Sequence, residues 1–379
     1  MTLKALVLCS DEKILRVLRR VLSDLEIGLE HCPDADSAIQ RLTRQRFEAL
    51  IVDCNDPSTA ALVLKSARTA PCNKRAVAVA IIDGSTGVRS AFEMGAHFAL
   101  YKPISTERAK ASFRAARALM KRERRRNSRL PVQIPISVSG VRIGSNQQAL
   151  TVDFSEGGMA VQFKYRVREG GALNFVFSLP GVGEEVHIQG EIAWESPNNL
   201  LGIRFVNVAP DLKHLLKTWF NQNSAEPDKD DPPVRCRLTD LSLGACYLEM
   251  VAPFPARTRV VLSMRAHNLE LRADGVVRVV HPDAGMGVEF TQGTTEQRAQ
   301  VERFIEGLRT NHGTLPDLLV EPEGLEPDGT ETVIESDLDD PLLDLFRTKS
   351  NAPVESFLRE LRKQRHTQSA DSAEVILEV

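Results

Sequence analysis

The sequence predicts a multidomain protein that joins an α/β domain to β domains. A doubly wound parallel sheet is expected first, followed by two small antiparallel β-barrels, each closed by a helix. Three observations support this fold class. Apolar runs alternate with helical patterns over residues 1–120, the apolar period changes to two after residue 131, and the second plan repeats from residue 234.

Composition limits the classes of function. The chain has 379 residues, of which 42% are hydrophobic and 26% are charged, and its formal net charge is −3. At about 100–200 residues per domain, this length predicts two to four domains with enough apolar material for their cores. The near-neutral balance argues against a surface devoted to nucleic acid, and an aromatic content of 5% argues against a base-stacking platform.

The sequence contains no stretch with the pattern of a leader or a membrane span. The first apolar run has five residues, too short for a signal peptide, and no run approaches ~18 residues. The six cysteines lack C-x-x-C spacing, and the histidines lack the spacing of metal ligands. We therefore expect a cytoplasmic protein with reduced thiols, and the spacing of its cysteines and histidines predicts no metal site.

The first 120 residues contain four apolar runs that predict buried strands. Helical patterns follow these runs, and this alternation favours a parallel sheet whose ligand sites lie beyond the carboxyl ends of its strands. Asp11, Asp53 and Lys102 fall at such ends. The four runs are residues 3–9, 47–53, 76–82 and 97–103.

This constellation resembles a response-regulator receiver domain with a flavodoxin-like sheet, over residues 1–120. The resemblance implies that Asp53 is the phosphoacceptor, that Lys102 precedes a cis proline, and that Asp11 and Asp53 would hold Mg²⁺. The sequence departs from the family at two positions: Ser10 replaces the first acidic residue, and the hydroxyl residue expected near Ile82 is absent. We therefore expect a degenerate receiver that serves in dimerisation or docking.

A long helix is predicted for residues 104–128, because strong helix formers fill it and it lacks internal Gly and Pro. Its end carries the basic cluster 121–129 with Arg124, Arg125 and Arg129. The planar fork of arginine donates paired hydrogen bonds to phosphate and to the Hoogsteen edge of guanine. A solvated helix face and a nucleic-acid patch are the plainer interpretations of such a cluster.

From residue 131 onward, short strands alternate with Gly, Asn or Pro turns, which predicts a small antiparallel barrel closed by a helix at 209–221. One of its turns has the sequence DFSEGG. This turn offers the Asp153 carboxylate, the Ser155 hydroxyl, and two glycines, Gly157 and Gly158, which allow a flat ligand to approach the backbone.

The two patterns together resemble the PilZ family over residues 121–222. The family motifs RRxxxR and [D/N]xSxxG are matched at Arg124, Arg125 and Arg129, and at Asp153, Ser155 and Gly158. The resemblance implies that cyclic di-GMP is the ligand. Its phosphates and guanine edges would meet the arginines, while Asp153 and Ser155 would hold a guanine on the barrel. The arginines follow the receiver's last helix, so binding is expected to reorient receiver and barrel.

A second unit repeats this plan after the polar linker 223–233. Residues 234–310 predict another barrel and closing helix, and this copy resembles a degenerate PilZ domain. Asp240 and Ser242 match the turn motif, but Ala245 replaces the last glycine and an acidic linker replaces the arginine arm. We expect this copy to be a structural or protein-interaction module that binds no cyclic di-GMP.

Residues 311–379 predict a disordered tail, because the segment 321–344 carries ten acidic residues and no basic one. A short amphipathic helix is predicted at 353–365. It is interpreted as a transient helix, a docking motif, or part of a strap whose acidic flank covers the arginine cluster.

The leading hypothesis from the sequence is a cyclic di-GMP effector that passes its signal to an unidentified signalling protein, with a homodimer through the receiver. The alternatives are a regulator driven by phosphorylation of Asp53 and an assembly scaffold that binds no ligand. A nucleic-acid-binding protein is a further reading of the basic cluster. An enzyme has the least support, because no nucleophile–base pair, metal cluster or Gly-rich phosphate loop is present.

Overall fold

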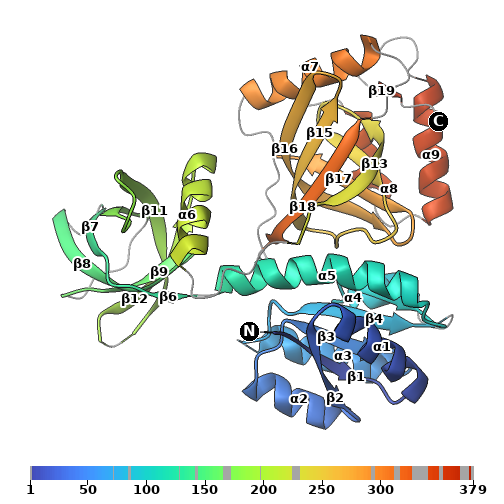
Figure 1. Cartoon of the computed structure of the whole chain (residues 1–379), viewed down its shortest axis with the longest axis horizontal. Coiled ribbons are helices and arrows are strands. Elements are labelled where there is room, and N and C mark those ends of the chain that lie inside the picture. The colour runs from blue at the N-terminus through green and yellow to red at the C-terminus, as the bar shows by residue number, and fades with distance from the viewer. Residues whose placement is uncertain are drawn as a thin grey trace. The chain divides into compact units, whose positions relative to one another are not determined.

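The computed structural model describes residues 2–70, 72–83, 87–127, 129–140, 144–164, 172–196, 198–223, 231–291, 295–310, 316–326, 340–349, 353–367 and 375–376. They form two compact units. The first contains residues 124–229, and the second contains residues 2–123 together with 230–379. Figure 1 shows the elements of both units.

The N-terminal domain is built on a five-stranded parallel sheet with the order β2-β1-β3-β4-β5. This order is that of flavodoxin-like folds, as predicted. The sequence did not reveal β2, an edge strand whose central residues are only half-buried and which therefore lacks a continuous apolar run. The strands are β1 (Leu3–Leu8), β2 (Ile27–Cys32), β3 (Ala49–Asp53), β4 (Val77–Ile82) and β5 (Phe98–Tyr101).

Five helices cover the two faces of this sheet. The side chains of α1 and α5 pack on one face, and those of α2, α3 and α4 pack on the other. Asp11, Asp34 and Asp56 cap the first three helices by accepting hydrogen bonds from backbone N–H groups. The helices are α1 (Glu12–Asp24), α2 (Ala35–Arg44), α3 (Pro57–Thr69), α4 (Val88–Glu93) and α5 (Thr106–Asn127).

The first barrel is a closed ring of six antiparallel strands, β8-β7-β10-β11-β12-β9, with β9 returning to β8. Helix α6 (Pro210–Asn223) covers one end with buried Leu216, Trp219 and Phe220, which confirms the expected closing helix. The ring strands are β7 (Pro135–Gly140), β8 (Gly144–Ser155), β9 (Gly158–Gln162), β10 (Leu173–Ser178), β11 (Glu185–Glu195) and β12 (Leu200–Val206), and the short β6 (Leu130–Pro131) pairs with β8 beside the ring.

The second barrel is also a closed ring of six strands, in the order β13-β14-β17-β16-β15-β18. Buried residues of α7 (Thr295–Thr310) pack against its interior. The strands are β13 (Val234–Leu241), β14 (Ala245–Glu249), β15 (Thr258–Ala266), β16 (Leu269–His281), β17 (Gly285–Phe290) and β18 (Asp317–Leu325).

Strand β18 corrects the expectation of a disordered segment after residue 310. It lies between β13 and β15, the place that β7 holds between β8 and β10 in the first barrel. The second barrel is therefore a circular permutation of the first, with its missing strand supplied after the closing helix. The acidic residues misled the prediction because they occupy alternate positions: Leu318, Val320 and Pro322 face inward and are buried, while Glu321 and Glu323 lie on the outer side.

Helix α8 (Pro341–Lys349) also replaces expected disorder, and α9 (Val354–Thr367) follows it. Both contribute to an apolar cluster on the second barrel, and α9 coincides with the amphipathic segment predicted at 353–365. A short strand, β19 (Val375–Ile376), pairs with β13. Of the acidic segment 321–344, on which the strap interpretation depended, residues 327–339 lie outside the described residues.

The N-terminal domain and the second barrel belong to the same compact unit, and α5 joins them. Lys121 Nζ lies 2.7 Å from an Asp231 carboxylate oxygen, and Arg122 Nε donates to the carbonyl of Pro322 at 3.0 Å. Glu123 Oε1 accepts from the N–H of Leu325 at 2.8 Å. The polar end of α5 is thus fixed to the C-terminal end of β18.

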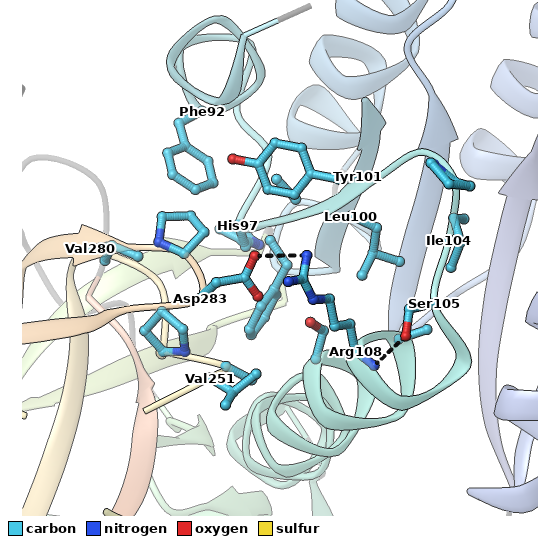
Figure 2. A pocket seen from close by; sticks show the side chains of 18 residues that line it. Phe92, His97, Leu100, Tyr101, Ile104, Ser105, Arg108, Val251, Val280 and Asp283 are labelled. Atoms are coloured by element: carbon cyan, nitrogen blue, oxygen red, sulfur yellow. Dashed lines mark hydrogen bonds and ion pairs between the residues drawn. The ribbon is translucent and has the colours of Figure 1, made fainter. Parts of the chain in front are cut away.

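A small cavity lies at the other end of this contact, between β5 and α5 of the N-terminal domain and the second barrel (Figure 2). Arg108 reaches across it to Asp283, 3.5 Å away. The cavity has a volume of about 50 Å³, which leaves room for a few water molecules and excludes a nucleotide. In the part of the chain that the structure describes, no helix is long and apolar enough to cross a membrane.

The position of β18 in the ring predicts the effects of two leucine substitutions. Leu318 is fully buried in the barrel and its neighbour Leu319 lies half-exposed on the outer side. Leu318→Ala should lower the free energy of unfolding by about 2–5 kcal/mol, because it leaves a cavity in a closed core. Leu319→Ala should lower the free energy of unfolding much less. Equal effects in chemical denaturation would contradict the inward placement of Leu318.

Candidate functional site

The outer face of the first barrel presents a row of four residues across four strands. Trp194 on β11 lies opposite Gly202 on β12, Gly202 lies opposite Ala160 on β9, and Ala160 lies opposite Asp153 on β8. Residues directly opposite on neighbouring strands point to the same side of a sheet. An exposed indole therefore stands at one end of the row, a carboxylate stands at the other, and two small residues separate them.

The short strand β6 brings Arg129 to the carboxylate end of this row. Leu130 and Pro131 pair with Phe154 and Asp153 on β8, so the residue before Leu130 arrives beside the Asp153 side chain. Arg129 Nη1 donates to Asp153 Oδ1 at 2.6 Å, and the same oxygen accepts from the N–H of Ala160 at 3.2 Å. The basic cluster and the turn motif thus meet at one point.

The turn between β8 and β9 is held by its own hydrogen bond. Ser155 is buried, and its hydroxyl donates to the carbonyl of Gly158 at 2.7 Å. A side chain on Gly158 would place its Cβ 2.1 Å from the carbonyl oxygen of Ile203, so β9 can approach β12 this closely only with glycine there. A Cβ on Gly157 would meet open space, and this glycine leaves the backbone accessible to a ligand.

Arg124 and Arg125 lie in the last turns of α5, ahead of Arg129. The Arg124 side chain is half-buried and Arg125 is buried. Cations near the C-terminus of a helix are favoured because the last carbonyl groups concentrate negative partial charge there. The helix therefore ends in a basic segment that leads directly into Arg129 and β6.

Two residues of this face were missed by the sequence analysis. Trp194 has a side chain that is 43% exposed and lies over Gly202, where an added Cβ would come within 2.1 Å of its indole nitrogen. Arg204 lies opposite Gly158 on the outer side and pairs with Glu191 at 2.8 Å. The sequence signal that could have revealed Trp194 is a tryptophan on one predicted strand and a glycine on the next, which together allow the indole to lie on the sheet.

The family model described as "PilZ domain" matches this barrel and its repeat, at residues 123–222 and 221–307. The chain carries two PilZ domains. They follow a receiver-like domain whose strand order is given above. Receiver and PilZ domains are typically signalling modules without catalytic activity.

Solved structures with similar folds come from both classes. The receiver domain of a sensor histidine kinase from Pseudomonas aeruginosa, which carries a magnesium ion, is 18% identical over 32% of this chain and 99% of that one, with a TM-score of 0.29. A chemotaxis response regulator of Vibrio cholerae is 22% identical over 28% and 92%, with a TM-score of 0.26. The PilZ domain of CeSA from a cellulose-synthesising bacterium is 21% identical over 24% and 96%, with a TM-score of 0.21. No curated protein matches the sequence.

The second PilZ domain keeps the turn but has different surroundings. The Ser242 hydroxyl donates to the carbonyl of Ala245 at 3.2 Å, as Ser155 donates to Gly158. The arginines Arg235 and Arg237 beside this motif face carboxylates: Arg235 lies 2.7 Å from Asp317, and Arg237 lies 3.8 Å from Glu249. These arginines line an open cavity of about 570 Å³. Carboxylates line it as well, so the cavity carries charges of both signs.

In the receiver-like domain, the structure brings Asp53 and Lys102 together. Lys102 Nζ lies 2.6 Å from Asp53 Oδ1 and 2.6 Å from Asn55 Oδ1, and the Lys102–Pro103 peptide bond is cis as the resemblance implied. The second oxygen of Asp53 faces the Cys9 thiol at 3.5 Å. Burial raises the pKa of Cys9 to about 11, so this thiol stays protonated and can donate to the carboxylate.

These residues do not fit Mg²⁺, which prefers an octahedral set of oxygen ligands. Asp11 Oδ1 caps α1 by accepting from the N–H groups of Lys13 and Ile14 at 2.7 and 3.3 Å. The Asp53 carboxylate is committed to a lysine and faces a thiol. Among the described residues, no group of three His, Cys, Asp or Glu side chains could hold a metal ion.

The turn geometry predicts different effects for its two glycines. Gly158→Ala should destabilise the first barrel by about 1–3 kcal/mol, because the added methyl group collides with the β12 backbone. Gly157→Ala should leave the free energy of unfolding nearly unchanged, because its Cβ meets no atom. Denaturant titration of both variants checks this, and a stable Gly158→Ala variant would contradict the close approach of β9 and β12.

The Asp53 site predicts resistance to phosphorylation. After incubation with acetyl phosphate and Mg²⁺, mass spectrometry should find no phosphate adduct on the wild-type chain, because the Asp11 carboxylate, which would share a Mg²⁺ with Asp53, caps α1 instead. The Asp53→Asn variant is the control. An adduct present in the wild type and absent from Asp53→Asn would restore phosphorylation as an input.

Proposed function

We propose that this chain is a cyclic di-GMP-binding effector of bacterial signalling and that its first PilZ domain holds the ligand. The contact of Arg129 with Asp153 carries the proposal, because it joins the two motifs at one end of an exposed face. The arginines at this face suit the two phosphates of a cyclic dinucleotide, and the Trp194 end of the row suits a guanine.

Each residue of the proposed site has a role that its position supports. Arg124, Arg125 and Arg129 supply donors for phosphate oxygens and for the N7 and O6 acceptors of guanine. Asp153 orients Arg129 and accepts from guanine nitrogens. Ser155 and Gly158 hold the turn, and Gly157 leaves space for the ligand.

Trp194 and Arg204 extend this site beyond the residues found from the sequence. Trp194 covers Gly202, Ala160 is buried between this tryptophan and Asp153, and the exposed indole offers a surface against which a planar base can stack. Base–aromatic stacking contributes about 1–3 kcal/mol per base. Charge-assisted hydrogen bonds add about 1.5–3 kcal/mol each, which supports micromolar or tighter binding after the cost of association.

The ligand arginines are continuous with α5, and this supports a mechanism at the hinge between receiver and barrel. Residues 121–123 of the helix are buried, and they contact Asp231 and β18. Ordering Arg124 and Arg125 around a ligand would change the end of the same helix. We infer that binding reorients the first barrel relative to the rest of the chain, without any catalytic step.

The output of this effector is a contact with another signalling protein. A homodimer through the receiver-like domain would need a face other than the β5–α5 edge, because residues of the second barrel pack there. A regulator driven by Asp53 is the second candidate. The Lys102–Asp53 ion pair favours this candidate, because receiver domains have the same pair of residue types at this site. The acetyl phosphate experiment decides between phosphorylation and cyclic di-GMP as the input.

Calorimetric titration with cyclic di-GMP tests the proposal. The wild-type chain should bind saturably and selectively over GTP and cyclic GMP. Arg129→Ala should weaken binding about 10- to 100-fold, as expected for the loss of one or two charge-assisted bonds, without unfolding the barrel.

Arg235→Ala is the matched control, because Arg235 also pairs with an aspartate at 2.7 Å but belongs to the second barrel. The affinity of the Arg235→Ala variant for cyclic di-GMP should equal that of the wild type. Retained affinity in Arg129→Ala, or equal losses in both variants, would contradict the proposed site.

A further inference from the structure

The second barrel repeats the outer row of the first, position by position. Val279, Gly287, Tyr247 and Asp240 are directly opposite one another on β16, β17, β14 and β13. They correspond to Trp194, Gly202, Ala160 and Asp153, and the register shifts occur at equivalent places in both barrels. The two barrels therefore present the same face, and on the second barrel α8 and α9 lie against it (Figure 1).

Asp340 connects α8 to the turn of the second barrel. Its Oδ2 accepts from the N–H of Gly244 at 2.8 Å, and its Oδ1 caps α8 by accepting from Leu342 and Leu343 at 3.1 and 3.2 Å. Gly244 occupies the place that Gly157 has in the first barrel. The carboxylate is only 4% exposed, so an anion from the chain itself already occupies this turn.

Aromatic residues cover the remainder of the row. The Phe346 ring fills the space above Gly287, where an added Cβ would come within 2.5 Å of it. Phe357 is fully buried, with its ring centroid 5.5 Å from that of Tyr247 and 4.4 Å from that of His281. The Tyr247 hydroxyl lies 3.0 Å from His281 Nδ1 beneath it. On the first barrel, the equivalent row leaves Trp194 exposed.

The apolar contacts of the helix pair are separate from the core of the barrel. Phe346, Phe357 and Leu361 form a cluster with Ala245, Tyr247 and Val279, all on the outer side of the strands. The inward residues Leu248, Val277 and Val288 belong to a different cluster with α7 and β18. The ring of six strands is complete without α8 and α9, so the pair is a cover on a finished barrel.

We propose that the helix pair α8–α9 is an intrachain ligand that occupies the binding face of the second PilZ domain. The assignment of this face as a binding face rests on the proposed function, because it is equivalent to the cyclic di-GMP site of the first domain. The docked pair closes the second domain to nucleotides. It makes that face a helix-docking surface, which recognises an aspartate at a helix N-terminus followed by aromatic anchors.

Hydrogen–deuterium exchange on the full chain tests this inference without any nucleotide. Phe357→Asp places a charge in the apolar contact and should release the pair. Exchange at the Gly244 amide and throughout α8 and α9 should rise at least tenfold, while amides of β15, β16 and β18 keep their protection. Arg359→Asp is the matched control, because Arg359 lies on the exposed side of the same helix and its variant should behave as the wild type.

A synthetic peptide of residues 340–367 should then restore protection of the Gly244 amide in the Phe357→Asp chain, saturably. The same peptide carrying Phe357→Asp should not. Loss of protection in β15, β16 and β18 together with α9 would overturn the inference, since the pair would then be part of the core. Failure of the native peptide to protect Gly244 on a folded barrel would overturn it as well.

The two proposals fail in distinguishable ways. Absence of cyclic di-GMP binding to the wild-type chain would remove the proposed function, whereas the exchange and peptide results use no nucleotide. In the Phe357→Asp chain, the first site should bind cyclic di-GMP with unchanged affinity, because the substitution lies in the other compact unit.

Discussion

A β-sheet leaves unpaired N–H and C=O groups along its edges unless each edge strand finds a partner. Both PilZ domains satisfy this constraint by closing six strands into a ring, and all other features of their outer faces depend on that closure. The first barrel fills the place between its motif strand and β10 with β7, which precedes the motif. The second fills the same place with β18, which follows the closing helix. The remaining strands pair in the same register in both rings, so the same four positions face outward.

Equivalent faces carry opposite charge at equivalent turns. In the first domain, the Arg129 guanidinium lies against the Asp153 carboxylate at the turn, which leaves a cationic arm beside open backbone at Gly157. In the second domain, the Asp340 carboxylate is bonded to the backbone of Gly244. A surface that offers cations attracts a phosphate ligand, and a surface that already holds a buried carboxylate repels one. One fold therefore carries an arginine arm at this face in one domain and a pair of covering helices in the other, through the residues that flank it.

The sequence predicted the elements that have a regular period of their own. The alternating strands of the barrels, the closing helices and the amphipathic α9 all follow from local patterns. Strand β18 was missed because its charges were counted without regard to alternation, and β2 because an edge strand needs fewer apolar residues. Trp194 and Arg204 could not be assigned from the sequence, since only the pairing of β11, β12 and β9 places them beside the motif. The docking of α9 depends likewise on residues far away in the chain, such as Tyr247 and His281.

The permutation also has a consequence during protein synthesis. The first barrel pairs β7 with β8 as a local hairpin, whereas β13 must wait for β18, with four strands and a helix between them in the chain. Barrels dominated by distant pairings fold more slowly, and domains form in the order in which the ribosome releases them. The nascent second barrel therefore exposes the edges of β13 and β15 after the first barrel is complete. During this interval the unpaired strand edges can pair with other chains, so the order of synthesis leaves the second barrel open to aggregation until β18 is released.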